Sequence, residues 1–436
     1  MIKAIVGLQM GDEGKGKFVD LLAQQYRHIV RFNGGANAGH SVVFNEQRMA
    51  FSQIPATIRN GKCLYISQGA LISLERLLQE IEFIKDHCPD TQLFIDPRCH
   101  IVLPIHAALN QASEQYKGVH KIGSVGVGVG ACYEDKSNRL GIRLQDTLNE
   151  SVLRHKLTLL WEIREKQIES VFEGRLHLNF EQQVQYILRL GKQLEPYFCF
   201  TNQVISRLLQ RGESMLLESS QATFLDNSFG TYPYTVAYST LIQSCFASIG
   251  IPAQTLQVLG VMKAYMIRVG NGPFPTELDG DIAQYIRVKG NEFGTVSQRP
   301  RRCGWLDLAL VEQAIHLNGV KEVAITNLDV LGGMDEVWVC NGYLLHGKKV
   351  CTDEALLHFD QVEPIYTKFQ GWPRLPNGIL NLSDLPKELL HYLAYIQSYI
   401  SAPIRYISYG AEREYTIHIE PNGFSQIILA DSEEYA

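Results

Sequence analysis

The sequence predicts an α/β protein, with a single large domain built around a mostly parallel central sheet that helices flank. Three observations lead to this prediction. Short apolar runs rich in β-branched residues recur along the chain, as in buried parallel strands. Helical stretches separate several of these runs. No Pro-, Gly- or Ser-rich linker, low-complexity tract or internal repeat divides the 436 residues, so we expect one domain over residues 1–436.

The expected strands begin with "KAIVGL" and end with "IRYISYG". In chain order they are residues 3–8, 28–32, 92–96, 214–219, 258–265, 322–329 and 404–410. Helices are predicted over residues 152–172, 182–212, 306–318 and 386–401. Because ligands of open α/β sheets bind at the carboxyl ends of the strands, we expect the chemistry to lie in the segments that follow them.

Composition limits the class of protein. With 45% hydrophobic residues the chain has material for a large core, and its net charge of -6 gives no basic field for a nucleic-acid backbone. The nine cysteines form no C-x-x-C pair, which argues against disulfides and zinc. No run approaches the roughly 20 apolar residues of a membrane span, and no cleavable signal precedes the first strand. We therefore expect a cytoplasmic protein that binds small phosphorylated ligands and neither nucleic acid nor membranes.

The segment "GDEGKGKF", residues 11–18, follows the first strand and is almost a phosphate-binding P-loop. Its glycines let peptide N–H groups converge on an anion, and Lys15 and Lys17 add positive charge. Phe18 stands where a P-loop has the hydroxyl that contacts Mg²⁺, so we expect the carboxylate of Asp12 to take that place. The alternative is a glycine-rich turn between a strand and a helix that binds nothing.

Two further loops after strands carry candidate residues. In "RFNGGANAGHSVVF", residues 31–44, glycines and asparagines surround His40, which can donate a hydrogen bond or a proton near neutral pH. In "AITNLDVL", residues 324–331, the carboxylate of Asp329 can accept from both N1–H and the 2-amino group of guanine, a donor pair that adenine lacks. The alternatives are a surface histidine and an ordinary turn.

Arginines cluster in "TVSQRPRRCGWLD", residues 295–307. Arg299, Arg301 and Arg302 suggest a loop that binds carboxylate or phosphate, because the guanidinium group can grip either with two hydrogen bonds. A solvated basic turn is the alternative. The glycine alternation over residues 123–141 lacks a preceding strand and does not indicate a dinucleotide-binding fingerprint.

Taken together, these segments resemble the adenylosuccinate synthetases, a family of GTP-dependent purine ligases. The matching pieces run in the family's order over nearly the whole chain, and the combination of the first, second and fifth is highly specific. They are "GDEGKGK" (11–17), "NAGHS" (37–41), "YEDK" (133–136), "GTYPY" (230–234), "RVGNGPFPTEL" (268–278), "GNEFG" (290–294), "GWLD" (304–307), "LDVL" (328–331) and "PIY" (364–366).

The resemblance implies the fold of that family, a homodimer, and Mg²⁺, with IMP, GTP and L-aspartate as substrates and adenylosuccinate, GDP and phosphate as products. The purine 6-oxo group leaves poorly, so it is first esterified by the γ-phosphoryl group of GTP and then displaced by the amine of aspartate. Asp12 would take the N1 proton and contact Mg²⁺, with the carbonyl of Gly39 as a second metal ligand. His40 would stabilise charge during phosphoryl transfer.

The resemblance also implies which residues contact each ligand. The catalytic residues would be Asp12, Lys15, His40 and Gln221. GTP would be held by Gly14, Lys15, Gly16, Lys17, His40, Asn327, Asp329, Ser408 and Gly410. IMP would contact Asn37, Gln221, Val269 and, from the neighbouring subunit, Arg139. Aspartate would lie against Val296, Ser297, Arg299 and Arg301.

At three positions the chain departs from the family where an anion contact is expected. Val125 and Val236 replace threonines that bind phosphate, and Val127 replaces an arginine. Losing a hydrogen bond to a charged group costs about 1.5–3 kcal/mol, and valine cannot donate one. Three hypotheses therefore stay open: a divergent adenylosuccinate synthetase, a paralogous ligase for another oxo-purine acceptor with an altered or absent 5′-phosphate, and a GTP-binding protein without catalytic activity.

Overall fold

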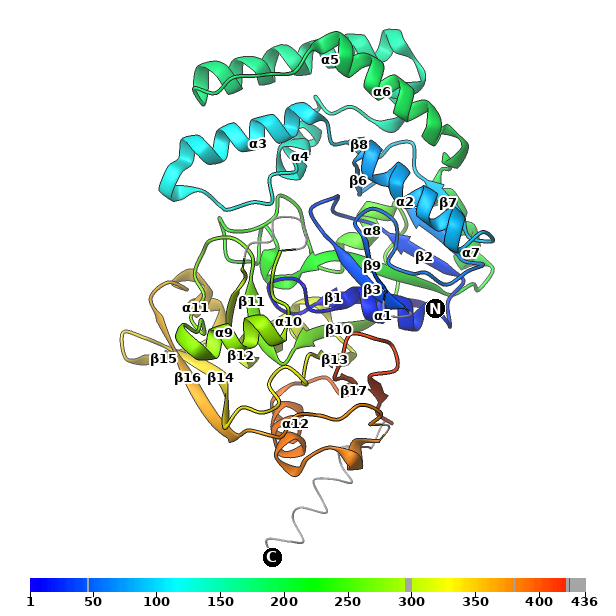
Figure 1. Ribbon diagram of the computed structural model, residues 1–436. Coiled ribbons are helices and arrows are strands. Elements are labelled where there is room, and N and C mark those ends of the chain that lie inside the picture. Colours follow the sequence, from blue (N-terminus) through cyan, green and yellow to red (C-terminus); the bar gives the residue numbers. More distant parts are fainter. Residues whose placement is uncertain (45–46, 295–299, 380, 421–422, 424–436) are drawn as a thin grey trace, which may run out of the picture.

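The main sheet lies at the centre of the molecule (Figure 1). The computed structural model describes residues 1–436 except 45–46, 295–299, 380, 421–422 and 424–436. Within these residues the sheet has nine strands in the order β18-β17-β13-β10-β1-β9-β2-β5-β7. Neighbouring strands run parallel except for β17 and β18 at one edge. The prediction of a mostly parallel central sheet is therefore confirmed.

All seven predicted strands are present in this sheet. Its strands are β1 (Ile2–Gly7), β2 (His28–Arg31), β5 (Cys63–Ile66), β7 (Gln92–Ile95), β9 (Met215–Ala222), β10 (Leu256–Lys263), β13 (Glu322–Thr326), β17 (Ile404–Ser408) and β18 (Thr416–His418). β5 and β18 were not predicted, because runs of four and three residues give too little periodicity to separate a strand from a loop. β13 ends at Thr326, three residues before its predicted end, because Asn327 turns the chain with a φ of 60°.

A second sheet, which the sequence did not predict, packs beside the first. It consists of β11 (Tyr265–Arg268), β12 (Arg302–Asp307), β14 (Glu336–Leu345), β15 (Lys348–Val350) and β16 (Val362–Gln370). Its pairs are antiparallel apart from β12 with β14. Two small ribbons join β3 (His40–Phe44) to β4 (Gln47–Phe51) and β6 (Leu71–Ile72) to β8 (His100–Ile101).

Three of the four predicted helices are confirmed and one is wrong. Residues 152–172 form α5 (Glu150–Lys166) and a π-helical turn, residues 306–318 form α10 (Leu308–Asn318), and residues 386–401 form α12 (Lys387–Tyr399). Residues 182–212 are two helices, α6 (Phe180–Leu194) and α7 (Thr201–Gln210). Pro196 lies in the 3-10 turn between them, where its missing N–H and fixed ring interrupt the helical ladder. The other helices are α1 (Lys15–Leu22), α2 (Leu74–His87), α3 (Pro104–Lys117), α4 (Val129–Asn138), α8 (Ser244–Ile249), α9 (Gly280–Lys289) and α11 (Thr352–Leu357).

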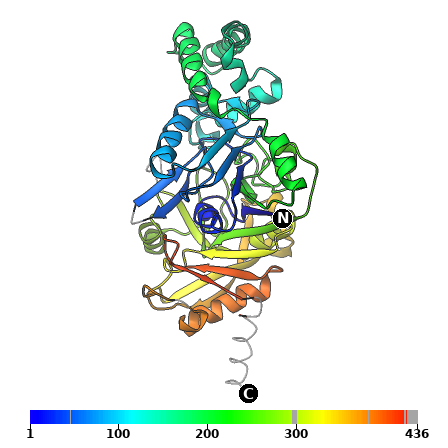
Figure 2. The ribbon, with the colours of Figure 1, turned by 90° about the vertical axis from the view of Figure 1, so that its right-hand side faces the viewer.

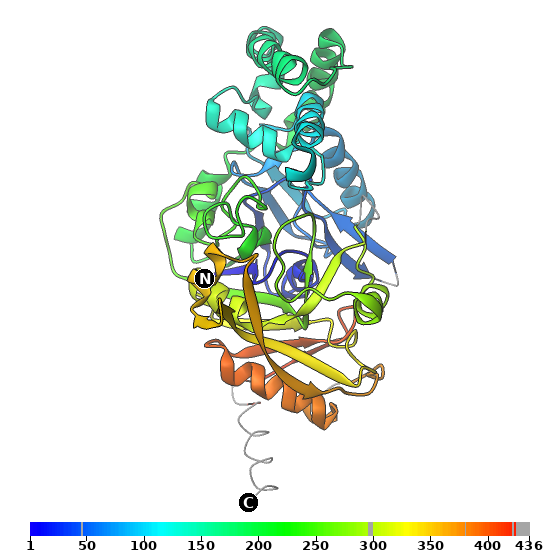
Figure 3. The same cartoon turned by 90° about the vertical axis from the view of Figure 1, so that its left-hand side faces the viewer.

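The central strand β1 divides the interior into two cores. Ile2, Ala4 and Val6 point into one core, and Ile5 points into the other, as the alternation of a strand requires. The first core also holds β12, β14, α10 and α12, and the second holds α1, α2, α3, α5 and α6. Figures 2 and 3 show α3 to α6 at one end of the molecule and α12 at the opposite end.

Two predictions from composition can be compared with the structure. All nine cysteines are free thiols, as expected from their scattered positions. Among the helices that the structure describes, none combines the length and apolar character that crossing a bilayer requires.

Candidate active site

Polar loops meet at one edge of the main sheet. β1, β2, β9, β10, β13 and β17 are connected by parallel pairings, so their carboxyl ends share that edge. The segments that follow β1, β2 and β13 contain Asp12, His40 and Asp329, and Gln221 is the second-last residue of β9 itself. These four residues therefore lie at the carboxyl ends of parallel strands, where ligands of open α/β sheets bind.

The loop between β1 and α1 is held in its shape by Glu13. Its carboxylate accepts from the peptide N–H of Gly11 at 2.7 Å and from Lys15 Nζ at 2.7 Å. Gly7 is required here, because a Cβ at that position would lie 2.3 Å from Glu13 Oε2. Gly11, Asp12 and Gly14 all have left-handed backbones, with φ of 105°, 58° and 91°. A non-glycine residue in that region is strained, which is common at functional sites.

Asp12 from this loop pairs with Arg301 at the start of the second sheet. Arg301 Nη2 lies 2.5 Å from Asp12 Oδ2, and Arg301 Nη1 lies 2.8 Å from Glu292 Oε2. The structure therefore brings Asp12 of the glycine-rich segment 11–18 next to Arg301 of the arginine-rich segment. Arg302 does not join them, because it pairs with Glu277 instead.

His40 is buried at the start of β3 and turned toward the sheet. Its Nδ1 contacts the carboxylate of Glu218 and its Nε2 lies 3.0 Å from the carbonyl oxygen of Ser220. Arg31 donates to the same Glu218 oxygen at 2.8 Å, and the peptide N–H of Ala56 donates to the other at 2.9 Å. The imidazole must leave these contacts before it can reach a phosphate in the cavity.

Burial and neighbouring charges both shift the pKa values of His40 and Glu218. Burial lowers the pKa of His40 and the charge of Arg31 adds to this, while Glu218 opposes both. Burial raises the pKa of the Glu218 carboxyl, but Arg31, His40 and the N–H of Ala56 outweigh it and hold that pKa below its usual value. Glu218 was not predicted as a site residue; its signal was a glutamate inside the otherwise apolar strand 214–219.

Asp12, Lys15 and His40 line one cavity of about 1040 Å³. Asn37 and Gln221 lie next to each other on it, with Gln221 Nε2 3.5 Å from the carbonyl oxygen of Asn37. The predicted residues that line the cavity are Asp12, Lys15, Asn37, Gly39, His40, Gln221, Val269 and Arg301. The volume is ample for a nucleotide-sized ligand.

A second cluster surrounds Lys17 and lies outside the cavity lining. Lys17 Nζ donates to Ser408 Oγ at 2.7 Å, to the carbonyl oxygen of Gly410 at 2.9 Å and to that of Tyr415 at 3.1 Å. Burial lowers the pKa of Lys17 to about 7, although the negative charge of Asp329 opposes that shift. Lys17, at the start of α1, thus links the loop after β1 to Ser408 in β17.

Asp329 belongs to this second cluster. Its Oδ1 is buried without a hydrogen-bond partner within the described residues, and burial raises the pKa of its carboxyl. A desolvated acceptor without a donor is costly, so it is suited to a ligand that brings N–H groups. Asn327 precedes it with a left-handed backbone.

Four predicted contacts are not among the described residues that line the cavity. Arg139 is exposed at the end of α4 and does not line the cavity. Val296, Ser297 and Arg299 lie in residues 295–299, outside the described residues. The structure therefore leaves the roles of these four residues untested.

Among the described residues, no group of three or more His, Cys, Asp or Glu side chains could hold a metal ion. Mg²⁺ is commonly bound by one or two protein oxygens together with substrate phosphates. The half-buried carboxylate of Asp12 and the carbonyl of Gly39, which both line the cavity, fit a metal ion that arrives with a nucleotide.

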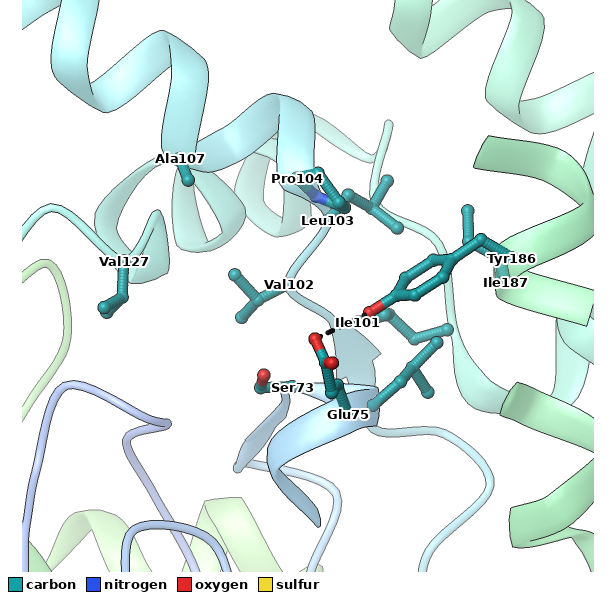
Figure 4. Close-up of a pocket in the computed structure, with 11 residues that line it drawn as sticks. Ser73, Glu75, Ile101, Val102, Leu103, Pro104, Ala107, Val127, Tyr186 and Ile187 are labelled. Atoms are coloured by element: carbon teal, nitrogen blue, oxygen red, sulfur yellow. Dashed lines mark hydrogen bonds between the residues drawn. The ribbon is translucent and has the colours of Figure 1, made fainter. Parts of the chain in front are cut away.

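A smaller pocket of about 170 Å³ lies between α6 and the first turns of α2 and α3 (Figure 4). Tyr186 donates to Glu75 across it at 3.4 Å. Ser73 and Val127 line both this pocket and the large cavity. Its other lining side chains are mostly apolar, so the large cavity is the better candidate for chemistry.

Comparisons with known proteins agree with this geometry. The family model described as adenylosuccinate synthetase matches residues 4–417. The chain is 60% identical over 420 residues to adenylosuccinate synthetase 1 of Photorhabdus laumondii, covering 96% of this chain and all of that protein. It is 37% identical to the adenylosuccinate synthetase of Acetivibrio thermocellus, covering 95% of this chain and 99% of that protein.

Solved structures give the same result. Fully ligated adenylosuccinate synthetase from Plasmodium falciparum is 30% identical with a TM-score of 0.88, covering 96% of this chain and 99% of that one. This match confirms the predicted fold class. The succinoaminodeoxyadenylate synthetase of cyanophage S-2L, at 19% identity and a TM-score of 0.61 over 98% of both chains, is similar in fold.

The Glu218 contacts predict a large effect on stability. Glu218→Gln keeps the side-chain shape but leaves Arg31 buried without its counter-charge, so we expect the free energy of unfolding to fall by about 3–5 kcal/mol. Urea unfolding measures this. The control is Glu322→Gln, which breaks a partly exposed pair with Lys3 and should cost about 1 kcal/mol or less. Equal losses in the two variants would contradict the importance assigned to Glu218.

Proposed function

The chain belongs to the adenylosuccinate synthetase family, and we propose that the large cavity is its active site. The protein is a ligase that forms a C–N bond between L-aspartate and C6 of IMP in a GTP-dependent reaction of purine biosynthesis. The 60% identity over the full length of a curated relative favours this function over the other two hypotheses. The observation that carries the proposed site is the gathering of Asp12, Lys15, His40 and Gln221 around one cavity.

Asp12 is the proposed base. Removing the N1 proton of IMP sends negative charge onto O6, which then attacks the γ-phosphorus of GTP. The ion pair with Arg301 occupies the carboxylate of Asp12. We infer that the carboxylates of substrate aspartate draw Arg301 away, so that the base becomes available when all substrates are bound.

Phosphate recognition is assigned to the first loop and the start of α1. Gly14, Gly16 and Lys15 offer peptide N–H groups and a charge, and His40 is proposed to turn from Glu218 toward the transferring phosphoryl group. Bound Mg²⁺ would neutralise phosphate charge. Asp12 and the carbonyl of Gly39 are the residues proposed to hold it.

Guanine recognition is assigned to the second cluster. Asp329 has a buried, unpartnered oxygen that would accept from N1–H and the 2-amino group of guanine. Asn327, Ser408 and Gly410 lie around it and around Lys17, on the far side of the first loop from the cavity lining. GTP would then extend from this cluster across the loop to the cavity.

The remaining contacts complete the proposal. Asn37, Gln221 and Val269 would contact IMP, together with Arg139 of the partner subunit in a homodimer. Val296, Ser297 and Arg299 would bind aspartate beside Arg301. We also propose that residues 1–436 act as one domain in the cytoplasm, since the cavity is lined by Ser220 and Gln221 of the main sheet and by Val269 and Arg301, which flank strands of the second sheet.

Replacing the base tests the mechanism. Asp12→Asn should lower GTP-dependent phosphate release by at least about a hundredfold, because the amide cannot accept the N1 proton. Asparagine tolerates a left-handed backbone, so the melting temperature should change little. The control is Asp360→Asn at an exposed position. Turnover within threefold of the control would mean that another group removes the proton.

Replacing the guanine acceptor tests nucleotide selectivity. Asp329→Asn presents one acceptor and one donor to a base that needs two acceptors, so the preference for GTP over ATP in kcat/KM should fall by about tenfold or more. The matched control is Asp335→Asn, which is exposed. An unchanged preference removes Asp329 from guanine recognition.

The shifted pKa of Lys17 predicts a pH dependence. Free Lys17 is charged below pH 7 and increasingly neutral above it, while bound phosphate favours the charged form. GDP affinity should therefore fall on the order of tenfold between pH 6.5 and 8.5, with proton uptake measurable by titration calorimetry in buffers of different ionisation enthalpy. Lys17→Arg stays charged and should have a flatter profile. Equal pH slopes in the two proteins would contradict this assignment.

A further inference from the structure

Part of the cavity wall is apolar. Val125 and Val269 line it and are each 44% exposed, which is high for valines in a polar cavity. Val127 and Val236 also line it and pack against a small apolar cluster. That cluster consists of Leu71, Val129, Cys132, Tyr133 and Tyr238, with the two tyrosine rings stacked at 4.6 Å. The four valines thus form an apolar surface on this side of the cavity, and the cluster behind them supports it.

The loop beside these valines has its first peptide N–H groups occupied by a carboxylate of the protein. Glu114 on α3 accepts from Ile122 at 3.2 Å, from Gly123 at 2.7 Å and from Ser124 at 3.3 Å. Glu114 lines the cavity together with this loop. Donors that could serve a phosphate are therefore already paired with an anion, which would also repel one.

The other charges on the described lining give no excess of positive charge here. Lys15 pairs with Glu13 and Arg301 pairs with Asp12, at the end of the cavity formed by the loop after β1. Arg76 is held by Glu80 at 3.1 Å. Glu134 is likewise held by Arg164 at 2.8 Å, which leaves Glu114 and the exposed Lys117. One acid faces one base, so the described side chains of this chain give this side no net positive charge.

The geometry of a purine directs its sugar to this side. C6 and N9 lie at opposite ends of the ring system, and O6 must face Asp12 and the first loop for phosphoryl transfer. The substituent on N9 then points into the rest of the cavity, which residues 122–130 and 232–237 border. The valines therefore meet the sugar end of the acceptor.

We propose that this enzyme also ligates aspartate to oxo-purine nucleosides that carry no 5′-phosphate, of which inosine is the parent compound. This inference rests on the proposed function and extends its range of acceptors. IMP still fits, because the amino-terminal turn of α4 borders the same wall and offers peptide dipoles to a phosphate. At Val125, Val127 and Val236 the wall offers no hydroxyl or charge, so a phosphate is left with the hydroxyls of Ser124 and Thr235 and with Arg139 of the partner subunit, as proposed above.

The chemistry is unchanged and balanced. The nucleoside loses its N1 proton to Asp12, O6 forms a bond to the γ-phosphorus, and the bond from that phosphorus to the bridging oxygen of GDP breaks. The amine of aspartate then bonds to C6 and loses a proton, while the C6–O6 bond breaks and inorganic phosphate leaves with the acceptor's oxygen. The products are the 6-succinylamino nucleoside, GDP and phosphate.

The experiment compares inosine with IMP in the full-length enzyme, measuring phosphate release that requires both GTP and aspartate and identifying the product by mass. We expect kcat/KM for inosine to lie within about a hundredfold of that for IMP, since two dedicated phosphate contacts would give more than that. A larger preference for IMP overturns the inference and leaves the proposed function standing. No release with either acceptor overturns both.

Isosteric variants test the valine wall directly. Val125→Thr and Val236→Thr each add a hydroxyl donor without changing size, so the ratio of kcat/KM for IMP to that for inosine should rise by about tenfold or more in each. The control, Val288→Thr, is on exposed α9 and should leave both values as in the wild type. A ratio that does not move in the two wall variants shows that these valines do not meet the sugar end, and overturns the inference.

Discussion

The buried carboxylate of Glu218 holds together the elements on which the active site is built. It projects from β9 and binds Arg31 of β2, His40 of β3 and the peptide N–H of Ala56. A lone anion at this depth would be strongly disfavoured, and so would a lone Arg31. Each charge is tolerated because the other is present, and the pair of Arg31 and Glu218 fixes the position of the His40 imidazole. In the ligand-free structure His40 is therefore held beside the ion pair of Arg31 and Glu218.

The site has two parts that the first loop separates. On one side is the cavity with Asp12, and on the other is the cluster of Lys17 and Asp329. Glu13 makes this possible, because its carboxylate fixes the loop from inside while Thr326 donates to its carbonyl oxygen at 2.8 Å. The cavity and the cluster adjoin the same loop, which fits the proposal that acceptor and donor nucleotides meet there for phosphoryl transfer.

Much of the fold could be predicted because parallel strands are buried on both faces and appear as apolar runs. "KAIVGL" and "EVAITNLD" were recognisable for this reason, and the loops after them contained Asp12 and Asp329. The second sheet was missed because its long strand Glu336–Leu345 is bulged between Cys340 and Gly342, so that its burial follows neither a continuous apolar run nor a regular alternation. Pro196 was overlooked within an otherwise helical pattern.

Contacts between segments that are far apart in the chain could not be predicted from the sequence. Nothing in the spacing of residues 12 and 301 indicates that the two side chains pair, nor that Glu13 turns inward while Asp12 turns toward the cavity. Glu218 could have been found, since a charge inside an apolar strand needs a buried partner, but His40 could not have been identified as that partner. Arg139 is proposed to act from a second copy of the chain, and in one copy it lies at the end of α4, away from the cavity lining.

The position of β1 has a consequence for synthesis on the ribosome. Its neighbours β9 and β10 begin at Met215 and Leu256, so the first strand made waits for more than two hundred residues before it can pair. At roughly 5–20 residues per second that delay is roughly 10–40 s, during which an apolar segment is unprotected. Lys17 waits longer still, since its partner Ser408 is 391 residues away. The surroundings of Lys17 are therefore complete only after Ser408 has been synthesised.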